Sequence, residues 1–246
     1  MKVSEILRVT REKMQGKWGF ALVVTIVVSA ITMSVPNLIT PSLGTMEFWA
    51  NTLWLILVSS PIAMGALWLF LDLYDGVEVE LRHVFDIFRD YSRVVTAVFW
   101  KRLFIVGWML LFLIPGIFAM IRYSQMEFLM KDDPMMTGQD AIRKSKEMMR
   151  GNKARYFILY LSIFWPALLG LALGVFMMMD AFATGYLFAG SVFVDQTRAS
   201  RAQLVSLVST AAFHLLNAYA RPAFAVFYRD LKSLEKEDDG WGMEGF

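Results

Sequence analysis

Five polar or ionisable side chains interrupt the apolar stretches of this 246-residue sequence. They are Arg122, Glu127, His214, Asn217 and Arg221. An ionisable residue within an apolar segment is costly unless it faces protein or water and finds a partner. We therefore predict an intramembrane polar site built from these residues. Such a site would either pin helices together through buried pairs or bind an anionic amphiphile or an ion.

The sequence leaves the pairing within this site open. Arg122 could reach Glu127 or Asp180, and Arg221 could reach Asp72 or Glu127. His214 and Asn217 lie three residues apart, on one face of a helix. A packed, hydrogen-bonded pair is the simpler interpretation of these two, and a proton-linked site is the alternative.

No motif of a known catalytic class is present. The chain has no cysteine and two histidines, and it contains no HExxH, GxSxG or Walker sequence. Without cysteine there can be no disulfide, thiolate metal site or cysteine nucleophile. We predict no catalytic residue, no metal site and no cofactor, so the protein is not expected to be an enzyme. A net charge of +2 also argues against nucleic acid as a partner.

A second group of candidate residues lies on two basic amphipathic helices. Residues 1–17 place apolar side chains at helical spacing on one face and cations on the other. Residues 137–151 do the same, opening on a capping box at Thr137 and closing at Gly151. Such helices lie on anionic membrane surfaces. The cations expected at lipid headgroups or a partner protein are Arg8, Arg11, Arg143, Lys144 and Arg150.

These two helices resemble each other. The segment ILRVTREKMQG, residues 6–16, aligns without gaps to AIRKSKEMMRG, residues 141–151. Each copy precedes a pair of apolar segments, which suggests a parallel internal repeat of the kind found in some transporters. The alternative is that any two basic amphipathic helices ending in glycine look alike.

The elements that would position these residues are membrane helices. The chain is 57% hydrophobic, above the roughly 45–50% of a soluble domain, and the excess is gathered into long blocks. We predict an all-α integral membrane bundle of about six transmembrane helices with amphipathic interfacial helices. Residues 1–17 would be the first interfacial helix, 18–232 the membrane domain and 233–246 a disordered cytoplasmic tail. The predicted transmembrane helices cover residues 18–35, 48–71, 94–114, 117–133, 156–179 and 204–228.

Two segments have an open interpretation. The pair Pro115-Gly116 predicts a tight hairpin between the third and fourth helices, and one long broken helix is the alternative. Residues 181–194 are apolar but too short to span comfortably, which favours a re-entrant or interfacial segment.

The distribution of lysine and arginine predicts the orientation. Residues 1–17 contain five, 36–47 none, 76–102 five, 131–155 seven, 180–203 two and 229–246 three. Cytoplasmic loops carry the excess of positive charge. The pattern places both termini in the cytoplasm of a multi-pass protein of the bacterial cytoplasmic membrane. It also favours the hairpin, because a single broken helix would place the seven-charge segment outside.

The sequence resembles a known but uncharacterised family of bacterial polytopic membrane proteins, domain of unknown function 975. The similar residues are the IPGI turn at 114–117, Arg122-Tyr123-Ser124, Asp133-Pro134, the run SKEMMRGNK at 145–153 and the segment FYRDL at 227–231. The chain departs from the family in about 25 extra residues, 178–203, and in reading Arg221-Pro222 where the family has Pro-Tyr. The resemblance implies a membrane location and a helical fold, and it implies no particular chemistry.

Three functions are compatible with these features. The one favoured by the sequence is a non-enzymatic factor in envelope homeostasis or in the assembly of membrane components. The second is a small transporter or lipid-handling protein with a polar intramembrane site. The third, a membrane enzyme, would need a converging acid–base or metal cluster. The expected partners are the lipid bilayer, anionic lipid headgroups and either another membrane protein or a second copy of the chain.

Overall fold

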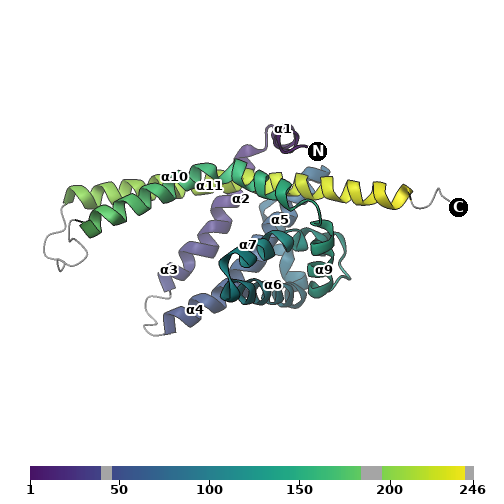
Figure 1. Ribbon diagram of the computed structural model, residues 1–246, viewed down its shortest axis with the longest axis horizontal. Coiled ribbons are helices and arrows are strands. Elements are labelled where there is room, and N and C mark those ends of the chain that lie inside the picture. Colours follow the sequence, from purple (N-terminus) through teal and green to yellow (C-terminus); the bar gives the residue numbers. More distant parts are fainter. Residues whose placement is uncertain (40–45, 184–195, 242–246) are drawn as a thin grey trace.

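The computed structural model describes residues 1–39, 46–183 and 196–241, and all regular elements in these ranges are helical (Figure 1). The elements are α1 (Val3–Lys13), α2 (Trp18–Ser29), η1 (Ala30–Ser34), α3 (Val35–Ile39), α4 (Glu47–Trp54), η3 (Leu55–Ser59), α5 (Ser60–Asp75), η4 (Leu81–Asp90), α6 (Tyr91–Leu111), α7 (Leu113–Arg122), α8 (Met126–Asp132), α9 (Gly138–Met148), α10 (Lys153–Ala183) and α11 (Gln196–Trp241).

Two continuous helical stretches in these ranges are long and apolar enough to cross a membrane. They are Glu47–Asp75 with 29 residues and Leu81–Leu111 with 31 residues. A third is obtained if α1 and the helix that follows it count as one broken span. Two to three possible spans are fewer than the six predicted. One reason is the length of α7, whose ten residues extend only about 15 Å against an apolar core of roughly 30 Å.

α1 is separate from the span that follows it. The helix axis bends by 99° between α1 and residues 18–33. Ile6, Thr10 and Met14 are buried on one face of α1, whereas the cations of the other face are exposed. This amphipathic helix, lying nearly perpendicular to α2, has the geometry of a helix at a membrane surface.

The two similar sequence segments adopt the same local structure. α1 begins fifteen residues before α2, and α9 begins fifteen residues before α10. Gly16 and Gly151 both have positive φ, +73° and +82°, which ends each helix in the left-handed conformation that glycine allows. Thr10 and its counterpart Ser145 are both fully buried. The repeat therefore extends to backbone register and to burial.

The third and fourth predicted helices differ in detail from the prediction. α7 packs back on α6 as a hairpin, but the chain breaks at Phe112, whose backbone is extended, and not at Pro115-Gly116. Pro115 lies in the first turn of α7, where a helix needs no backbone N–H. Gly116 lets α6 approach, because a Cβ there would lie 2.2 Å from Cγ of Met109. The predicted single helix 117–133 is divided at residues 123–125 into α7 and α8.

The C-terminal region also departs from the prediction. Helix α11 continues to Trp241, so residues 233–241 are helical where a disordered tail was predicted from residue 233. Four consecutive residues at its start, Leu234 to Glu237, are good helix formers. The predicted re-entrant segment 181–194 lies mostly outside the described residues.

α10 and α11 are the longest elements and lie side by side across the molecule (Figure 1). α11 also contacts α1, α2 and α5, so it connects the two halves of the chain. Phe70, Phe128, Phe227 and Tyr228 are among the largest fully buried side chains, and they come from α5, α8 and α11. Many apolar side chains stay exposed, including Leu110, Phe112 and Ile114 at the α6–α7 turn, as expected for a lipid-facing surface.

We expect Gly65→Ala to destabilise the fold. A Cβ at Gly65 in α5 would lie 2.1 Å from the backbone oxygen of Val84 in η4, so one of the two elements must shift. The expected cost is about 1–3 kcal/mol, measured by thermal unfolding in detergent. Gly107→Ala is the matched control, because a Cβ there meets nothing within 4 Å and alanine favours the helix. Equal stability of both variants would contradict the close packing of α5 on η4.

Candidate functional site

A cavity of about 500 Å³ lies between α5, α6, α7, α8, α10 and α11. Its wall is mainly apolar, with side chains such as Leu67, Ile105 and Phe224. The volume falls in the range of about 300–1,000 Å³ that is typical of small-molecule sites. The polar residues in the wall are Lys101, Ser124, Glu127, Tyr156, Tyr160, Asn217 and Arg221. Three of these, Glu127, Asn217 and Arg221, belong to the predicted intramembrane site.

Glu127 in this wall is paired with Lys101, and not with Arg122 or Arg221 as the sequence suggested. Lys101 Nζ donates to Glu127 Oε1, and the two side chains are only 17% and 16% exposed. Trp68 also fixes this region, because its Nε1 donates to the backbone oxygen of Glu127 at 2.7 Å. Lys101 was not among the residues predicted to form the intramembrane site. Sequence spacing could not show that Lys101 pairs with Glu127, since the two residues lie on different helices.

Arg221 is the cation of the cavity wall that lacks an acidic partner. Its Nη1 donates to Thr25 Oγ1 at 3.4 Å. Within the described residues no carboxylate lies within 4.0 Å of it. The two carboxylates considered as its partners pair with other cations, Asp72 with Lys131 at 2.5 Å and Glu127 with Lys101. One ion pair and one further cation leave the wall with a net positive charge.

Asn217 and His214, two further residues of the predicted intramembrane site, make their side-chain contacts within their own helix. Asn217 Nδ2 donates to the backbone oxygen of Phe213 at 2.8 Å, a contact within one helix, while the side chain lines the cavity. His214 does not line it and packs edge-on against Phe213. Its Nδ1 is buried without a hydrogen-bond partner among the described residues.

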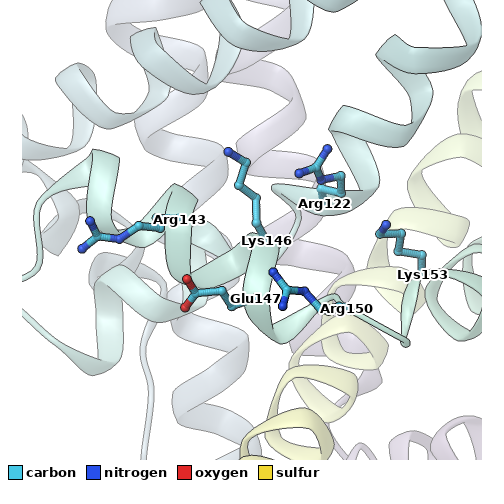
Figure 2. Close-up of a pocket in the computed structure, with 6 residues that line it drawn as sticks. All are labelled: Arg122, Arg143, Lys146, Glu147, Arg150 and Lys153. Carbon is cyan, nitrogen blue, oxygen red and sulfur yellow. The ribbon is translucent and has the colours of Figure 1, made fainter.

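Arg122 lies away from the other four and lines a second hollow of about 260 Å³ (Figure 2). We call this hollow the basic cleft. Arg122 enters it from the end of α7, and the remaining residues come from α9, the turn after it and the start of α10. The residues that line it are Arg122, Arg143, Lys146, Glu147, Arg150 and Lys153. Asp180, the other partner considered for Arg122, has a side chain outside the described residues.

A buried serine holds the two sides of the basic cleft together. Ser145 Oγ donates to the backbone oxygen of Arg122 at 2.8 Å and accepts from the backbone N–H of Gln125 at 3.2 Å. Both Ser145 and Gln125 are fully buried. Ser145 was not among the residues predicted for a functional site. The contact fixes where Arg122 leaves α7 relative to the cations of α9.

The five predicted headgroup residues do not form one surface. Arg143 and Arg150 line the basic cleft. Arg8 lies 3.9 Å from Glu5 and 3.8 Å from Glu12, both exposed pairs on its own helix. Lys144 pairs with Glu235 at 3.3 Å, and Arg11 donates to the backbone oxygen of Leu7 at 3.3 Å.

A cluster of charged side chains joins α8, α11 and α5. Asp132 at the end of α8 accepts hydrogen bonds from Tyr228 at 2.8 Å and Arg229 at 2.7 Å, and also from Lys232. Arg229, just after the predicted transmembrane segment, also pairs with Asp75 at the end of α5. Burial alone would lower the pKa of Arg229, but hydrogen bonds to Asp75 and Asp132 outweigh it and raise the pKa above its usual value.

The family model described as protein of unknown function (DUF975) matches residues 95–235, more than half of the chain. The chain belongs to this family. The matched segment contains all of the basic cleft and all of the cavity wall except Ala63 and Leu67. No curated protein and no solved structure matches the chain.

Charge reversal at Glu127 should show which cation it pairs with. Glu127→Lys alone should lower the unfolding temperature, because it leaves two cations in a partly buried site. Adding Lys101→Glu should restore most of the loss, whereas adding Arg122→Glu should not. The measurement is a double-mutant cycle by thermal unfolding in detergent. Rescue by Arg122→Glu instead would mean that the ion pair is wrongly assigned.

Proposed function

We propose that the protein is a non-enzymatic, multi-pass membrane protein that binds an anionic amphiphile in the cavity. Of the functions considered from the sequence, this is the lipid-handling one. The observation that carries it is the cavity itself, with an apolar wall and Arg221 unmatched by any described carboxylate. The wider role in envelope homeostasis or membrane-component assembly stays a prediction.

The arrangement of the cavity wall fits a ligand with an apolar chain and an acidic head. The apolar chain would lie along Leu67, Ile105 and Phe224, where burial of apolar surface is favourable. The acidic head would lie at Arg221, because a guanidinium binds carboxylate or phosphate oxygens in a bidentate manner. The Lys101–Glu127 pair is already neutral and would contribute hydrogen bonds more than net charge.

We further propose the predicted topology: six crossings of the bacterial cytoplasmic membrane with both termini in the cytoplasm. In Figure 1 the ends of α3 and α4 and the C-terminal end of α10 lie toward the left, whereas α1, α9 and the C-terminal end of α11 lie toward the right. The right-hand elements carry lysine and arginine, whereas α3, α4 and the C-terminal half of α10 carry none. The crossing through α7 is the shortest and would require local thinning of the bilayer.

The test is to identify what the protein retains through purification. Full-length protein would be purified in mild detergent, and bound amphiphiles measured by native mass spectrometry. We expect an acidic amphiphile to be retained, and Arg221→Gln to lower its occupancy about tenfold or more, since a charged hydrogen bond contributes about 1.5–3 kcal/mol. Ala63→Phe, which adds a ring to the cavity wall, should lower it as well.

Arg102→Gln is the matched control. Arg102 is another half-buried cation, but it donates to Ser60 Oγ at 2.7 Å and does not line the cavity. This variant should retain the amphiphile as the wild type does. If Arg221→Gln and Ala63→Phe fold and keep the same amphiphile at the same occupancy, the proposal is wrong.

A further inference from the structure

We propose that the basic cleft is a binding site for a phosphate group, formed by Arg122, Lys146, Arg150 and Lys153 at the cytoplasmic surface. This site is separate from the cavity, and the inference does not depend on the function proposed for the cavity. Figure 2 shows that these side chains come from two sides of the hollow and that Arg143 lies at its rim.

The first argument is the distribution of paired charges. Around the basic cleft, cations are matched to carboxylates: Lys131 with Asp72, Arg155 with Asp230, and Arg229 with Asp75 and Asp132. The four cations of the proposed site have no carboxylate within 4.0 Å in the part of the chain that the structure describes. Glu147 lines the cleft but forms an ion pair with none of them.

The second argument is that the fold holds these cations together. The buried Ser145 joins Arg122 to α9 through its 2.8 Å hydrogen bond, and Lys146 Nζ lies 5.9 Å from the centre of the Tyr123 ring. Like charges brought together in this way repel each other, and a bound anion would relieve the repulsion. Two guanidinium groups and two ammonium groups are the donors that proteins use for phosphate oxygens. A volume of 260 Å³ suits a small polyanionic group and not a whole lipid.

The third argument is the comparison with the first copy of the repeat. Arg143, Lys146 and Glu147 have counterparts in Arg8, Arg11 and Glu12. Arg150 and Lys153, however, stand where the first copy has Gln15 and Trp18. The second copy therefore has cations at two positions where the first copy has none, and both of these cations line the cleft (Figure 2).

The experiment uses full-length protein in an uncharged detergent and three probes: dioctanoyl phosphatidic acid, dioctanoylglycerol, which lacks the phosphate, and pyrophosphate. Binding would be followed by native mass spectrometry and by intrinsic tryptophan fluorescence. We expect at least one phosphate probe to bind the wild type and the double variant Arg122→Gln/Arg150→Gln to bind it at least about tenfold more weakly. Arg11→Gln, which removes the matching charge from α1, should bind as the wild type does, and Arg221→Gln should leave pyrophosphate binding unchanged.

The three probes distinguish a phosphate group on a lipid from one on a soluble compound. Binding of phosphatidic acid without pyrophosphate would identify a lipid headgroup at the cleft if the double variant weakens it and Arg221→Gln does not. Tight binding of pyrophosphate would identify a soluble phosphate compound. Either result supports the site, whereas phosphatidic acid binding that only Arg221→Gln weakens belongs to the cavity and counts against the cleft. If the double variant does not fold, Lys153→Gln replaces it, because that side chain has no hydrogen bond or ion pair to lose among the described residues. This variant should weaken binding about fivefold. The proposal is overturned if no phosphate probe binds the wild type, if dioctanoylglycerol binds as well as phosphatidic acid, or if Arg11→Gln weakens binding as much as the cleft variants.

Discussion

The hydrogen bonds of Asp132 are the interaction on which both sites depend. This carboxylate accepts from Tyr228, Arg229 and Lys232 of α11, and Arg229 extends the network to Asp75 at the end of α5. The ends of α5 and α8 therefore meet the C-terminal part of α11 at one point. On one side of this point they form walls of the cavity, and on the other α8 leads into α9 and the basic cleft. The charged groups of this network are partly buried, so each needs a partner of opposite charge at hydrogen-bonding distance. A charge left without a partner would destabilise the fold by its full desolvation cost.

The distribution of charge pairing separates structural cations from candidate functional ones. Cations such as Lys101, Lys131 and Arg155 each have a carboxylate, and they join α6 to α8, α8 to α5 and α10 to α11. Arg221 has no carboxylate partner among the described residues, and neither have four cations of the basic cleft, Arg122, Lys146, Arg150 and Lys153. In a membrane protein such unmatched positive charge is compatible with an anion that comes from outside the chain. This distinction, more than the presence of a cavity, connects the fold to the two proposals.

The internal repeat relates α9, which forms one side of the basic cleft, to the N-terminal helix α1. α1 and α9 share register, a buried hydroxyl and a glycine end, so each can cover a helix pair in the same way. They differ in what the buried hydroxyl contacts. Thr10 donates to the backbone oxygen of Ile6 in its own helix, whereas Ser145 donates to Arg122 of another helix. One change of contact therefore converts a surface helix into one side of a cleft.

The sequence by itself determined the properties that depend on neighbours along the chain. It predicted the helical class, the family, the amphipathic helices up to Gly16 and Gly151 and the repeat between them, because helical periodicity and glycine ends are local features. Only the tertiary structure decided which faces of different helices meet. Arg122, for which Glu127 and Asp180 were both considered as partners, lies in the basic cleft, and Glu127 pairs with Lys101. Spacing along one helix cannot show which other helix faces it. Two helices also differ in length from the prediction. α7 is short because the chain breaks at Phe112. α11 continues to Trp241 because the start of its charged end consists of good helix formers, although the charge pattern had suggested disorder.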